Sequence, residues 1–561
     1  MQKPWLLHYP KDVPAEISTD GYRSLVDLLD RACQAYGQRR AVTFMGSSLL
    51  YSDLDQKAND VAAWIQQQGL PQGSRIALMM PNLVSYMVIM LGVLRAGMVV
   101  VNVNPMYKAR ELEHQLADSD VALIFIFEKF ASTLAAVPKD AQPERAVLVS
   151  LGDLMGLKGH LLNFALRYVQ RAIPAYQLDN AVRFSDVLRQ GASGAFAPPA
   201  IGMDDVAILQ YTGGTTGVPK GAMLTHSNLV ANVLQVQAVA RPVLGDAPGQ
   251  PLTMLTALPL YHIFALTVCG LFAAHAGMCS VLIADPRNLR SIIKAWRSDP
   301  INIFPAVNTL FNGLVHQPDF AKLDFSGLRL CFGGGAAVQR AVAEKWHSVT
   351  GLPLIEGYGL SETSPVALVN PTNSTQYSGD IGFPLPSTEV VVLGEADRIV
   401  PYGETGELAI RGPQVMKGYW RQPDETASSF TANGFFRTGD IGIMSDQGRV
   451  RIVDRKKDMI LVSGFNVYPN EVEQVVASHP GVLECAVVGV PSAETGEMVK
   501  LYVVKKDSGL TEQSLRDWSA ERLTGYKRPH VIEFRNELPK SNTGKILRRV
   551  LRDETVEKNK G

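Results

Sequence analysis

The segment from Val206 to Gly221 reads VAILQYTGGTTGVPKG, an apolar strand that runs directly into a turn of glycine, threonine and lysine. Glycine lets backbone N–H groups converge on an anion, threonine hydroxyls add donors, and lysine adds a compact positive charge. The pattern is not a Walker P-loop, because no Gly-Lys-Ser/Thr triplet follows a four-residue spacer. A glycine-rich turn without chemistry is the alternative. We expect a nucleotide triphosphate to bind at Thr212, Gly213, Gly214, Thr215, Thr216, Gly217 and Lys220.

Apolar strands and helices alternate around this segment. Short, mostly apolar strands at 75–79 and 99–103 and an unbroken apolar strand at 121–127 are separated by helical periodicity at 83–96 and 110–117. Continuous apolar strands between helices are typical of a parallel sheet covered on both faces. With 561 residues, the chain is too long for a single core. We therefore expect an α/β protein whose large N-terminal domain contains parallel sheets covered by helices.

The predicted pattern of secondary structure changes from about residue 380. Short strands separated by glycine turns predict a small β-rich subdomain over 380–454, at the end of an N-terminal domain of 1–454. A charged run, DRKKD at 454–458, follows and is predicted to be an exposed boundary that few contacts cross. Beyond it, residues 459–561 have strands and helices of their own, which predicts a small α+β C-terminal domain.

Composition excludes several classes of protein. Lys+Arg and Asp+Glu both number 54, and this balance argues against a nucleic-acid binder, which would carry a basic excess. The five cysteines form no C-x-x-C pair, so neither a disulfide framework nor a zinc site is expected, and a reducing compartment fits best. The first sixteen residues contain no long apolar run and do not resemble a signal peptide. We expect a cytoplasmic protein.

Residues 158–176 mix leucines and aromatic side chains with lysine and arginine. This composition suits a basic amphipathic helix lying on a membrane surface, and the alternative is a surface helix packed on its own domain. The early apolar run at 83–94 falls well short of the roughly 20 residues that span a bilayer. Its length argues against a transporter. Peripheral contact with the inner face of the cell membrane through 158–176 is a hypothesis.

Two further glycine-containing segments suit the other parts of a nucleotide. The three glycines of CFGGGA at 331–336 permit a flat ring to approach the backbone, although a tight turn explains them equally well. In EGYGLSE at 356–362, Tyr358 can stack on a purine and Ser361 can donate to a phosphate. Glu362 can hold Mg²⁺, which prefers one or two carboxylates with phosphate oxygens. A polar loop without a ligand is the alternative for this segment.

Four single residues complete the candidate site. Asp440 can accept hydrogen bonds from both ribose hydroxyls, with Arg455 beside it, although a structural salt bridge competes with this interpretation. Lys545 follows a glycine in a flexible turn and can reach another domain's cleft, where it would stabilise charge on phosphate oxygens. His262 stands among apolar residues and is either a hydrogen-bonded core histidine or part of a substrate channel.

In this order and at these separations, the segments resemble the adenylate-forming superfamily of acyl-CoA synthetases, peptide-synthetase adenylation domains and luciferases. The resemblance covers about residues 25–550 and is strongest to bacterial long-chain fatty acid–CoA ligases. Residues 433–457 resemble the fatty-acid signature region of those ligases. They depart from it where the commoner Trp, Leu, His and Trp are replaced by Phe435, Phe436, Arg437 and Met444.

The resemblance implies ATP-dependent ligation of a long-chain fatty acid to CoA through an acyl-adenylate, with release of AMP and pyrophosphate and with Mg²⁺ as cofactor. It implies metal ligands at Thr212 and Glu362, and we count His262 and Lys545 with them as candidate catalytic residues. Further nucleotide contacts are expected at Gly334, Gly335, Ala336, Glu356, Gly357, Tyr358, Gly359, Ser361, Asp440 and Arg455. A hinge at 455–458, centred on Lys457, and CoA contacts are also implied, the latter at Ser463, Gly464 and Phe465.

Other functions stay open on the residues alone. One alternative is an adenylating ligase for medium-chain or aryl acids, or for the thiol of a carrier protein. Another is a fatty-acid or nucleotide sensor with a degenerate site, against which the intact candidate residues argue. Leu461 stands where some relatives carry a further lysine, so no second catalytic lysine is expected. Family members are often homodimers, which makes a homodimer an expectation by analogy.

Overall fold

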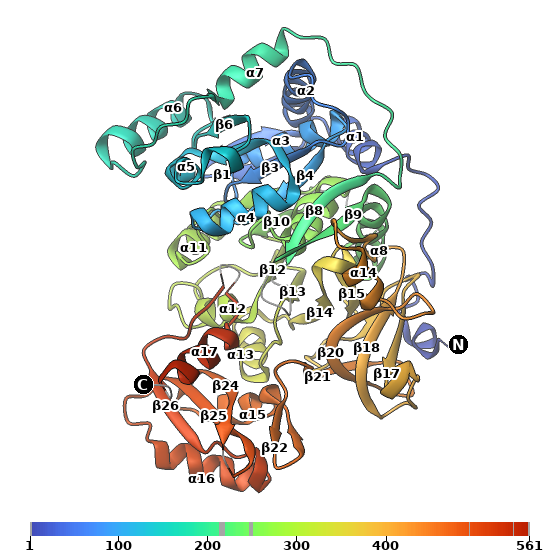
Figure 1. Cartoon of the computed structure of the whole chain (residues 1–561), viewed down its shortest axis with the longest axis vertical. Helices are drawn as coiled ribbons and strands as arrows, with labels where there is room; N and C mark the ends of the chain where they lie inside the picture. Colours follow the sequence, from blue (N-terminus) through green and yellow to red (C-terminus); the bar gives the residue numbers. More distant parts are fainter. Residues whose placement is uncertain (1–2, 213–218, 246–250, 493, 542–543, 559–561) are drawn as a thin grey trace.

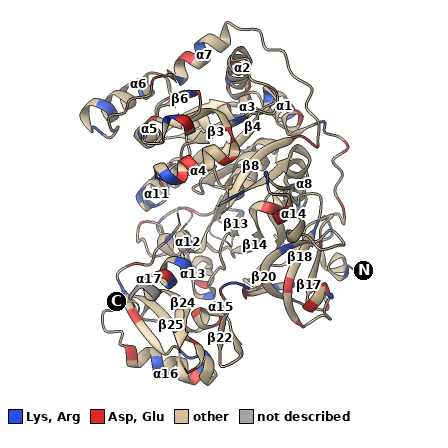
Figure 2. Cartoon of the chain, in the orientation of Figure 1, with Lys and Arg blue, Asp and Glu red and all other residues tan. Residues whose placement is uncertain are grey.

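The computed structural model describes residues 3–212, 219–245, 251–492, 494–541 and 544–558. Figure 1 shows helices and two largely parallel sheets in the upper part of the molecule, a smaller antiparallel sheet beside them, and the C-terminal unit at the bottom. Acidic and basic residues are interspersed over most elements of the chain, in keeping with a net charge of zero (Figure 2).

The first sheet contains the strand that leads into the glycine- and threonine-rich turn. Its order, within the described ranges, is β19-β9-β8-β4-β3-β5-β6-β7, parallel from β8 to β7, with β9 and β19 antiparallel. The strands are β3 (Arg75–Met79), β4 (Val99–Asn102), β5 (Val121–Phe127), β6 (Arg145–Val149), β7 (Ala181–Arg183), β8 (Val206–Thr212), β9 (Lys220–Thr225) and β19 (Gly418–Tyr419). The apolar runs at 75–79 and 121–127 therefore form the predicted strands.

The second sheet brings together strands from much of the N-terminal domain. Its order over the described residues is β16-β15-β14-β13-β12-β10-β11-β1-β2, parallel from β14 to β1 and antiparallel at both edges. The strands are β1 (Arg40–Phe44), β2 (Ser47–Leu50), β10 (Thr253–Thr256), β11 (Cys279–Leu282), β12 (Ile303–Ala306), β13 (Leu330–Gly333), β14 (Ile355–Gly359), β15 (Val366–Val369) and β16 (Phe383–Pro384).

Helices cover both sheets, and one of them is buried on every side. All residues of α3 (Val84–Arg95) are buried, and Gly97 follows it in the left-handed conformation with φ of 73°, as the sequence predicts. The others in the N-terminal part are α1 (Leu25–Ala35), α2 (Tyr51–Gln67), α4 (Ala109–Ser119), α5 (Ala131–Ala135), α6 (Gly156–Phe164), α7 (Phe184–Ala192), α8 (His226–Leu244), α9 (Ile263–Ala265), α10 (Ala273–His275), α11 (Leu289–Ser298), α12 (Asn308–Val315), α13 (Arg340–Thr350) and α14 (Pro423–Ser429).

Two small units complete the chain. An antiparallel sheet is formed by β17 (Glu389–Leu393), β18 (Thr405–Arg411), β20 (Phe436–Met444) and β21 (Val450–Arg455). The C-terminal unit has its own apolar cluster around β22 (Ile460–Val462), β23 (Phe465–Val467), β24 (Val482–Ser492), β25 (Gly496–Lys505), β26 (Val531–Arg535), α15 (Pro469–Ala477), α16 (Glu512–Arg522) and α17 (Arg548–Lys558).

The charged run between these units is not uniformly exposed. Lys456 and Lys457 are exposed, but the side chain of Asp454 has no exposed surface. Its carboxylate accepts from the backbone N–H of Asn470 at 2.7 Å and from Arg548 at 3.2 Å. The prediction of an exposed run that few contacts cross is therefore wrong for Asp454, because donors from beyond the run surround its carboxylate.

The segment at 158–176 forms a shorter helix than the sequence predicts. Helix α6 (Gly156–Phe164) continues as a π-helical turn over Ala165–Val169, and Arg171 then takes a positive φ of 49°. In Figure 1 this element projects from the edge of the molecule. Several of its apolar side chains face solvent, including Leu157 (84% exposed), Leu161 (72%) and Phe164 (59%). None of the described helices is both long enough and apolar enough to cross a bilayer.

Candidate active site

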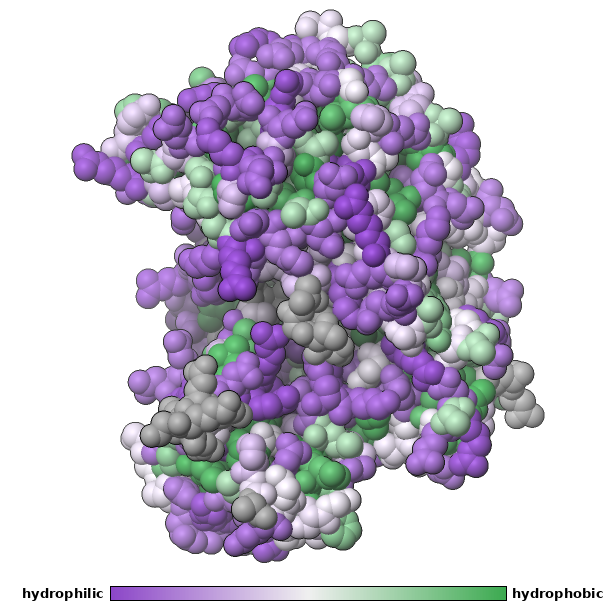
Figure 3. All heavy atoms as spheres, viewed as in Figure 1, coloured by the Kyte–Doolittle hydropathy of each residue, from purple (hydrophilic) through white to green (hydrophobic). Residues whose placement is uncertain are grey.

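A cavity of about 570 Å³ opens where the two large sheets, the antiparallel sheet and the C-terminal unit meet. On the face of the molecule that Figure 3 shows, hydrophilic residues cover most of the area. The cavity wall has an apolar part and a polar part. The apolar part includes Val236, Val239, Phe264, Val268 and Phe332, and the polar part includes Thr212, Lys220, Ser361, Glu362, Arg455 and Lys545.

Thr212 and Lys220 lie opposite each other at the ends of β8 and β9. They are register partners in the antiparallel pair, which places the two ends of the glycine- and threonine-rich turn together. Lys220 is almost fully buried and forms an ion pair with Glu425, and its ammonium nitrogen stands 5.5 Å from the ring centroid of Tyr419. Gly213, Gly214, Thr215, Thr216 and Gly217 lie outside the described residues.

Glu362 faces the same cavity from the short helical turn over Ser361–Thr363. The side chain is buried and accepts a hydrogen bond from the hydroxyl of Tyr419 at 2.9 Å. Burial raises the pKa of Glu362, because a charged carboxylate is less well solvated there than in water. Together with the hydroxyl of Thr212, this carboxylate is a donor set that suits Mg²⁺ bound to phosphate oxygens.

No cluster of three or more His, Cys, Asp or Glu side chains within the described ranges could hold a metal ion by itself. A cation near Glu362 would therefore need further oxygens. The phosphates of a bound nucleotide would supply them, which is the coordination that Mg²⁺ usually has in nucleotide sites.

Tyr358, Asp440 and Arg455 form a connected polar group beside the cavity. The Tyr358 hydroxyl donates to Oδ2 of Asp440 at 2.6 Å, and Nε of Arg455 pairs with Oδ1 at 2.8 Å. Asp440 and Arg455 are register partners in β20 and β21, so the strand pairing itself aligns them. Tyr358 and Arg455 line the cavity, and Asp440 lies directly next to both. The carboxylate is thereby oriented before any ligand arrives.

The predicted glycines line the cavity where the backbone must pass close to other atoms. A Cβ on Gly334 would meet ring carbons of Phe264 at 3.2 Å and the carbonyl oxygen of Gly357 at 3.3 Å. A Cβ on Gly359 would lie 1.8 Å from the carbonyl oxygen of Pro365, so packing alone requires glycine there. Gly335 and Gly357 also line the cavity.

Besides Asp440, two further predicted nucleotide contacts, Glu356 and Ala336, do not line the cavity. The buried carboxylate of Glu356 accepts from the backbone N–H of Val338 at 2.9 Å and from the hydroxyl of Tyr377 at 3.1 Å. Burial raises the pKa of Glu356 to about 7. Ala336, in the intervening turn, is likewise outside the cavity wall. Glu356 therefore supports the turn that carries Ala336 from behind.

Lys545 reaches the cavity from the C-terminal unit. Its backbone carbonyl accepts from the N–H of Ser541 at 2.7 Å, and the carbonyl of the preceding Gly544 accepts from the Thr309 hydroxyl at 3.1 Å. The second bond attaches the turn to helix α12 of the N-terminal part. The side chain keeps accessible surface because it faces the cavity, yet desolvation in the cleft, reinforced by Arg455, lowers the pKa of Lys545 to about 8.

His262 lines the cavity too, at the start of α9. Burial, reinforced by the charge of Lys545, lowers the pKa of this imidazole to about 4. It is therefore neutral at pH 7, as a histidine facing a substrate channel or a cationic partner would be.

The residues expected to meet CoA lie apart from this cavity. Ser463 and Gly464 form the tight connection between β22 and β23, both with positive φ, and Phe465 is the first residue of β23. Phe465 is exposed and stacks on Tyr526, with ring centroids 4.8 Å apart. In this arrangement Lys545, and not the 463–465 turn, faces the cavity.

Comparison with known proteins places the chain in a family. The model of the AMP-binding enzyme family matches residues 29–420, and the model of the AMP-binding enzyme C-terminal domain matches residues 471–545. The chain belongs to the AMP-binding enzyme family. Its fold is the α/β fold that the sequence predicts.

Curated members of the AMP-binding enzyme family match almost the whole chain. A long-chain-fatty-acid–CoA ligase of Escherichia coli O157:H7 is 51% identical over 556 residues, covering 99% of this chain and 98% of that protein. A ligase of the same name from Haemophilus influenzae is 45% identical, covering 100% and 99%. The solved structure of ATP-bound MatB from Rhodopseudomonas palustris is 28% identical with a TM-score of 0.80, covering 94% of this chain and 98% of that one.

Proposed function

We propose that this AMP-binding family enzyme joins a long-chain fatty acid to CoA through an acyl-adenylate. In the first half-reaction, a carboxylate oxygen of the fatty acid attacks the α-phosphorus of ATP. The bond from that phosphorus to the bridging oxygen breaks, and pyrophosphate leaves. In the second, the sulfur of CoA attacks the acyl carbon, the acyl–phosphate bond breaks, AMP leaves and the thiol proton passes to solvent.

One observation carries the proposal: Lys545 of the C-terminal unit faces the cavity that Thr212, Lys220 and Glu362 line. Transfer at phosphorus depends on positioning and on neutralising negative charge more than on a protein nucleophile. Cationic and hydrogen-bonding groups from separate elements converge here, as that chemistry needs. The near-complete overlap with long-chain-fatty-acid–CoA ligases, and the ATP-bound structural neighbour, support the choice of substrates.

The remaining binding roles follow from the same arrangement. Asp440 and Arg455 would hold the ribose, and the base would lie between Tyr358 and the Gly333–Gly335 strand end, on the polar side of the cavity. Thr212 and Glu362 would hold Mg²⁺, which when bound neutralises part of the phosphate charge. The apolar wall suits a hydrocarbon chain, whose burial contributes about 0.8 kcal/mol per CH₂.

The second half-reaction would need a different arrangement of the C-terminal unit. Ser463, Gly464 and Phe465 are our candidates for meeting CoA, and they lie outside the cavity while Lys545 occupies its rim. Turning of the unit about Lys457 would exchange the two segments. Hinge motion of this kind is a common way to assemble different sites in sequence.

Peripheral membrane contact through 158–176 is part of the proposal. The support is the row of exposed apolar side chains on α6 beside basic residues such as Lys158. Such a surface suits the boundary between acyl chains and anionic headgroups, where long-chain fatty acids also partition. A homodimer is the family-based expectation, which analytical ultracentrifugation would test.

The decisive experiment measures pyrophosphate release with a panel of carboxylic acids, each with and without CoA. We expect release with long-chain acids, and consumption of free thiol only when CoA is present. A preference for medium-chain or aryl acids, or thiol consumption only with a carrier protein, would favour the alternative ligases. If no acid gives pyrophosphate release, the proposed enzymatic function is wrong, and the alternative of a fatty-acid or nucleotide sensor is favoured.

A further inference from the structure

A buried carboxylate stands at the junction between the two parts of the chain. Asp454, near the end of β21, has a side chain with no exposed surface. Its Oδ1 accepts from the backbone N–H of Arg455 at 2.7 Å and from Nη1 of Arg548 at 3.2 Å. Its Oδ2 accepts from the backbone N–H of Asn470 at 2.7 Å. A buried charge is tolerated only when it is paired and hydrogen-bonded, so these donors hold the carboxylate in place.

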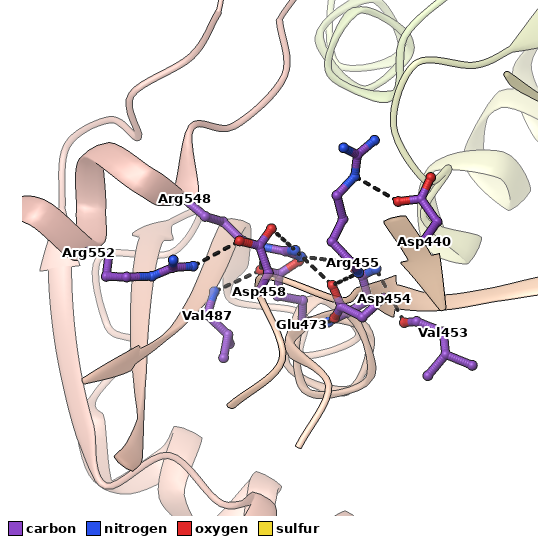
Figure 4. Close-up of polar contacts among 10 residues, drawn as sticks. Asp440, Val453, Asp454, Arg455, Asp458, Glu473, Val487, Arg548 and Arg552 are labelled. Atoms are coloured by element: carbon purple, nitrogen blue, oxygen red, sulfur yellow. Dashed lines mark hydrogen bonds and ion pairs between the residues drawn. The ribbon is translucent and has the colours of Figure 1, made fainter. Parts of the chain in front are cut away.

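Two of the three donors come from the far side of the proposed hinge. Asp454 and Arg455 precede Lys457, whereas Asn470 is the second residue of helix α15 and Arg548 is the first residue of helix α17. Figure 4 shows Arg548 reaching from the C-terminal unit to the strand end that carries Asp454. These contacts therefore depend on where the C-terminal unit sits.

Arg548 is itself held rigidly within the C-terminal unit. Its Nε donates to Oε1 of Glu473 at 3.0 Å and its Nη2 donates to Oε2 at 2.6 Å, a bidentate pair that fixes the guanidinium plane. Nη1 is left directed at Asp454, with Oδ2 of Asp458 3.7 Å away (Figure 4). Glu473 lies on α15, so this pair belongs to one unit and moves with it.

The position of Arg548 is coupled to that of Lys545 through a short stretch of chain. Arg548 comes three residues after Lys545 and begins α17. The turn that ends at Lys545 is closed by the bond from the N–H of Ser541 to the carbonyl of Lys545, and it is attached to α12 through the Thr309 hydroxyl and the carbonyl of Gly544. Holding Arg548 against Asp454 therefore fixes one end of the segment that directs the lysine into the cavity.

We propose that Asp454 is a positioning residue for adenylate formation: its contacts with Arg548 and Asn470 hold the C-terminal unit where Lys545 faces the cavity. The inference rests on the two-step function proposed above. When the unit turns about Lys457, Asp454 stays with the N-terminal part, loses both donors and meets water. Burial raises the pKa of Asp454 to about 6 and Arg548 opposes that rise, so the carboxylate is ionised at neutral pH.

The test separates the two half-reactions in Asp454→Asn, which keeps the shape of the side chain and removes its charge. Adenylate formation is measured from fatty acid and ATP without CoA, and thioester formation from supplied acyl-adenylate with CoA. We expect the first rate to fall roughly 10- to 100-fold, as for loss of a buried charged hydrogen bond, and the second to be unchanged or faster. Equal loss of both rates would overturn the inference.

Glu473→Gln is the matched control. It removes another carboxylate that holds Arg548, but one that belongs to the moving unit. We expect both half-reactions to change by the same factor in this variant. The same selective loss of adenylation in Glu473→Gln would contradict a special role for Asp454.

A second readout does not depend on activity. Lys456 and Lys457 are exposed, and release of Asp454 should loosen the segment that they occupy, so trypsin should cut there several times faster in Asp454→Asn. Unchanged cleavage would count against the inference. If Asp454→Asn does not fold, Arg548→Lys replaces it: a single ammonium keeps the charge but cannot pair with Glu473 and also supply the separate donor that Nη1 gives Asp454, so the same selective loss of adenylation is expected. A wild-type enzyme that forms no adenylate would overturn the proposed function instead.

Discussion

The hydroxyl of Tyr358 donates to Oδ2 of Asp440 at 2.6 Å while Arg455 holds Oδ1 at 2.8 Å, so one carboxylate is gripped from two different strands. Tyr358→Phe keeps the ring and removes one of these partners. We expect KM for ATP to rise about tenfold with little change in kcat, because the lost bond orients a binding group and not the reacting atoms. Steady-state kinetics at varied ATP checks this. A fall in kcat at unchanged KM would contradict it.

Lys545→Ala should abolish the first half-reaction alone. Removal of one preorganised charge partner costs roughly 10²- to 10³-fold in rate, and the loss should appear in adenylate formation. Thioester formation from supplied acyl-adenylate should be unaffected. Lys540→Ala is the control, because Lys540 lies on the same turn but pairs with Glu484 at 2.7 Å. If Lys545→Ala makes adenylate at a near-normal rate, the role given to Lys545 is wrong.

The pH dependence of adenylate formation should report Lys545. Its pKa is lowered to about 8, so the ammonium charge is present below that pH and is lost as the pH rises through it. We expect kcat/KM for ATP, which reflects the free enzyme, to fall above about pH 8. Bound triphosphate favours the charged form, so the fall in kcat should come at higher pH. The pKa of His262 is lowered to about 4, so this histidine is already neutral throughout the pH range in which Lys545 loses its charge and does not contribute to the fall. A profile that stays flat through pH 8 would exclude this assignment.

Lys457→Pro should slow the thiol step far more than adenylation. Proline fixes φ and removes the backbone N–H, which restricts rotation at the proposed hinge. Lys457→Ala separates the backbone from the side chain: it leaves the peptide free to turn and should keep both steps closer to normal. Equal slowing of both half-reactions by proline would argue against a hinge at this residue.

Replacing Leu157, Leu161 and Phe164 by serine should weaken binding to vesicles that contain anionic lipid. These side chains are exposed on one projecting element, and their apolar surface would enter the headgroup region. Co-sedimentation measures the loss, and added salt should weaken the wild-type protein further. Leu7→Ser, which changes an exposed leucine elsewhere, is the control. Unchanged co-sedimentation of the triple variant would remove the hypothesis.

Local pattern was sufficient to predict the strands and the class of fold. Arg75–Met79 is apolar after its first residue and Val121–Phe127 is apolar throughout, and such runs are buried on both faces of a parallel sheet. The order of the strands was not predictable in this way, since β10 pairs with β12 and β8 with β4 through contacts distant in the chain. The run of glycines at a strand end was likewise a local pattern, and it correctly indicated that Gly334 and Gly335 lie where a ligand can approach the backbone, in the cavity wall.

Several partners within the candidate site left no signal in the sequence. Glu425 pairs with Lys220 from 205 residues away, and Tyr419 meets Glu362 from 57 residues away. Neither follows from spacing, because the fold alone brings them together. The burial of Asp454 was missed for a related reason. A charged run is usually solvated. The free-energy cost of burying the Asp454 carboxylate is offset by hydrogen bonds from Asn470 and Arg548, which are distant in the sequence.

All five cysteines of the chain are buried and unpaired: Cys33, Cys269, Cys279, Cys331 and Cys485. Burial raises the pKa of every one of these thiols, so little reactive thiolate is present at neutral pH. A colorimetric thiol reagent added to the folded enzyme should therefore count CoA and not the protein. For the same reason, a cysteine engineered on the surface could carry a fluorophore without first removing the native ones.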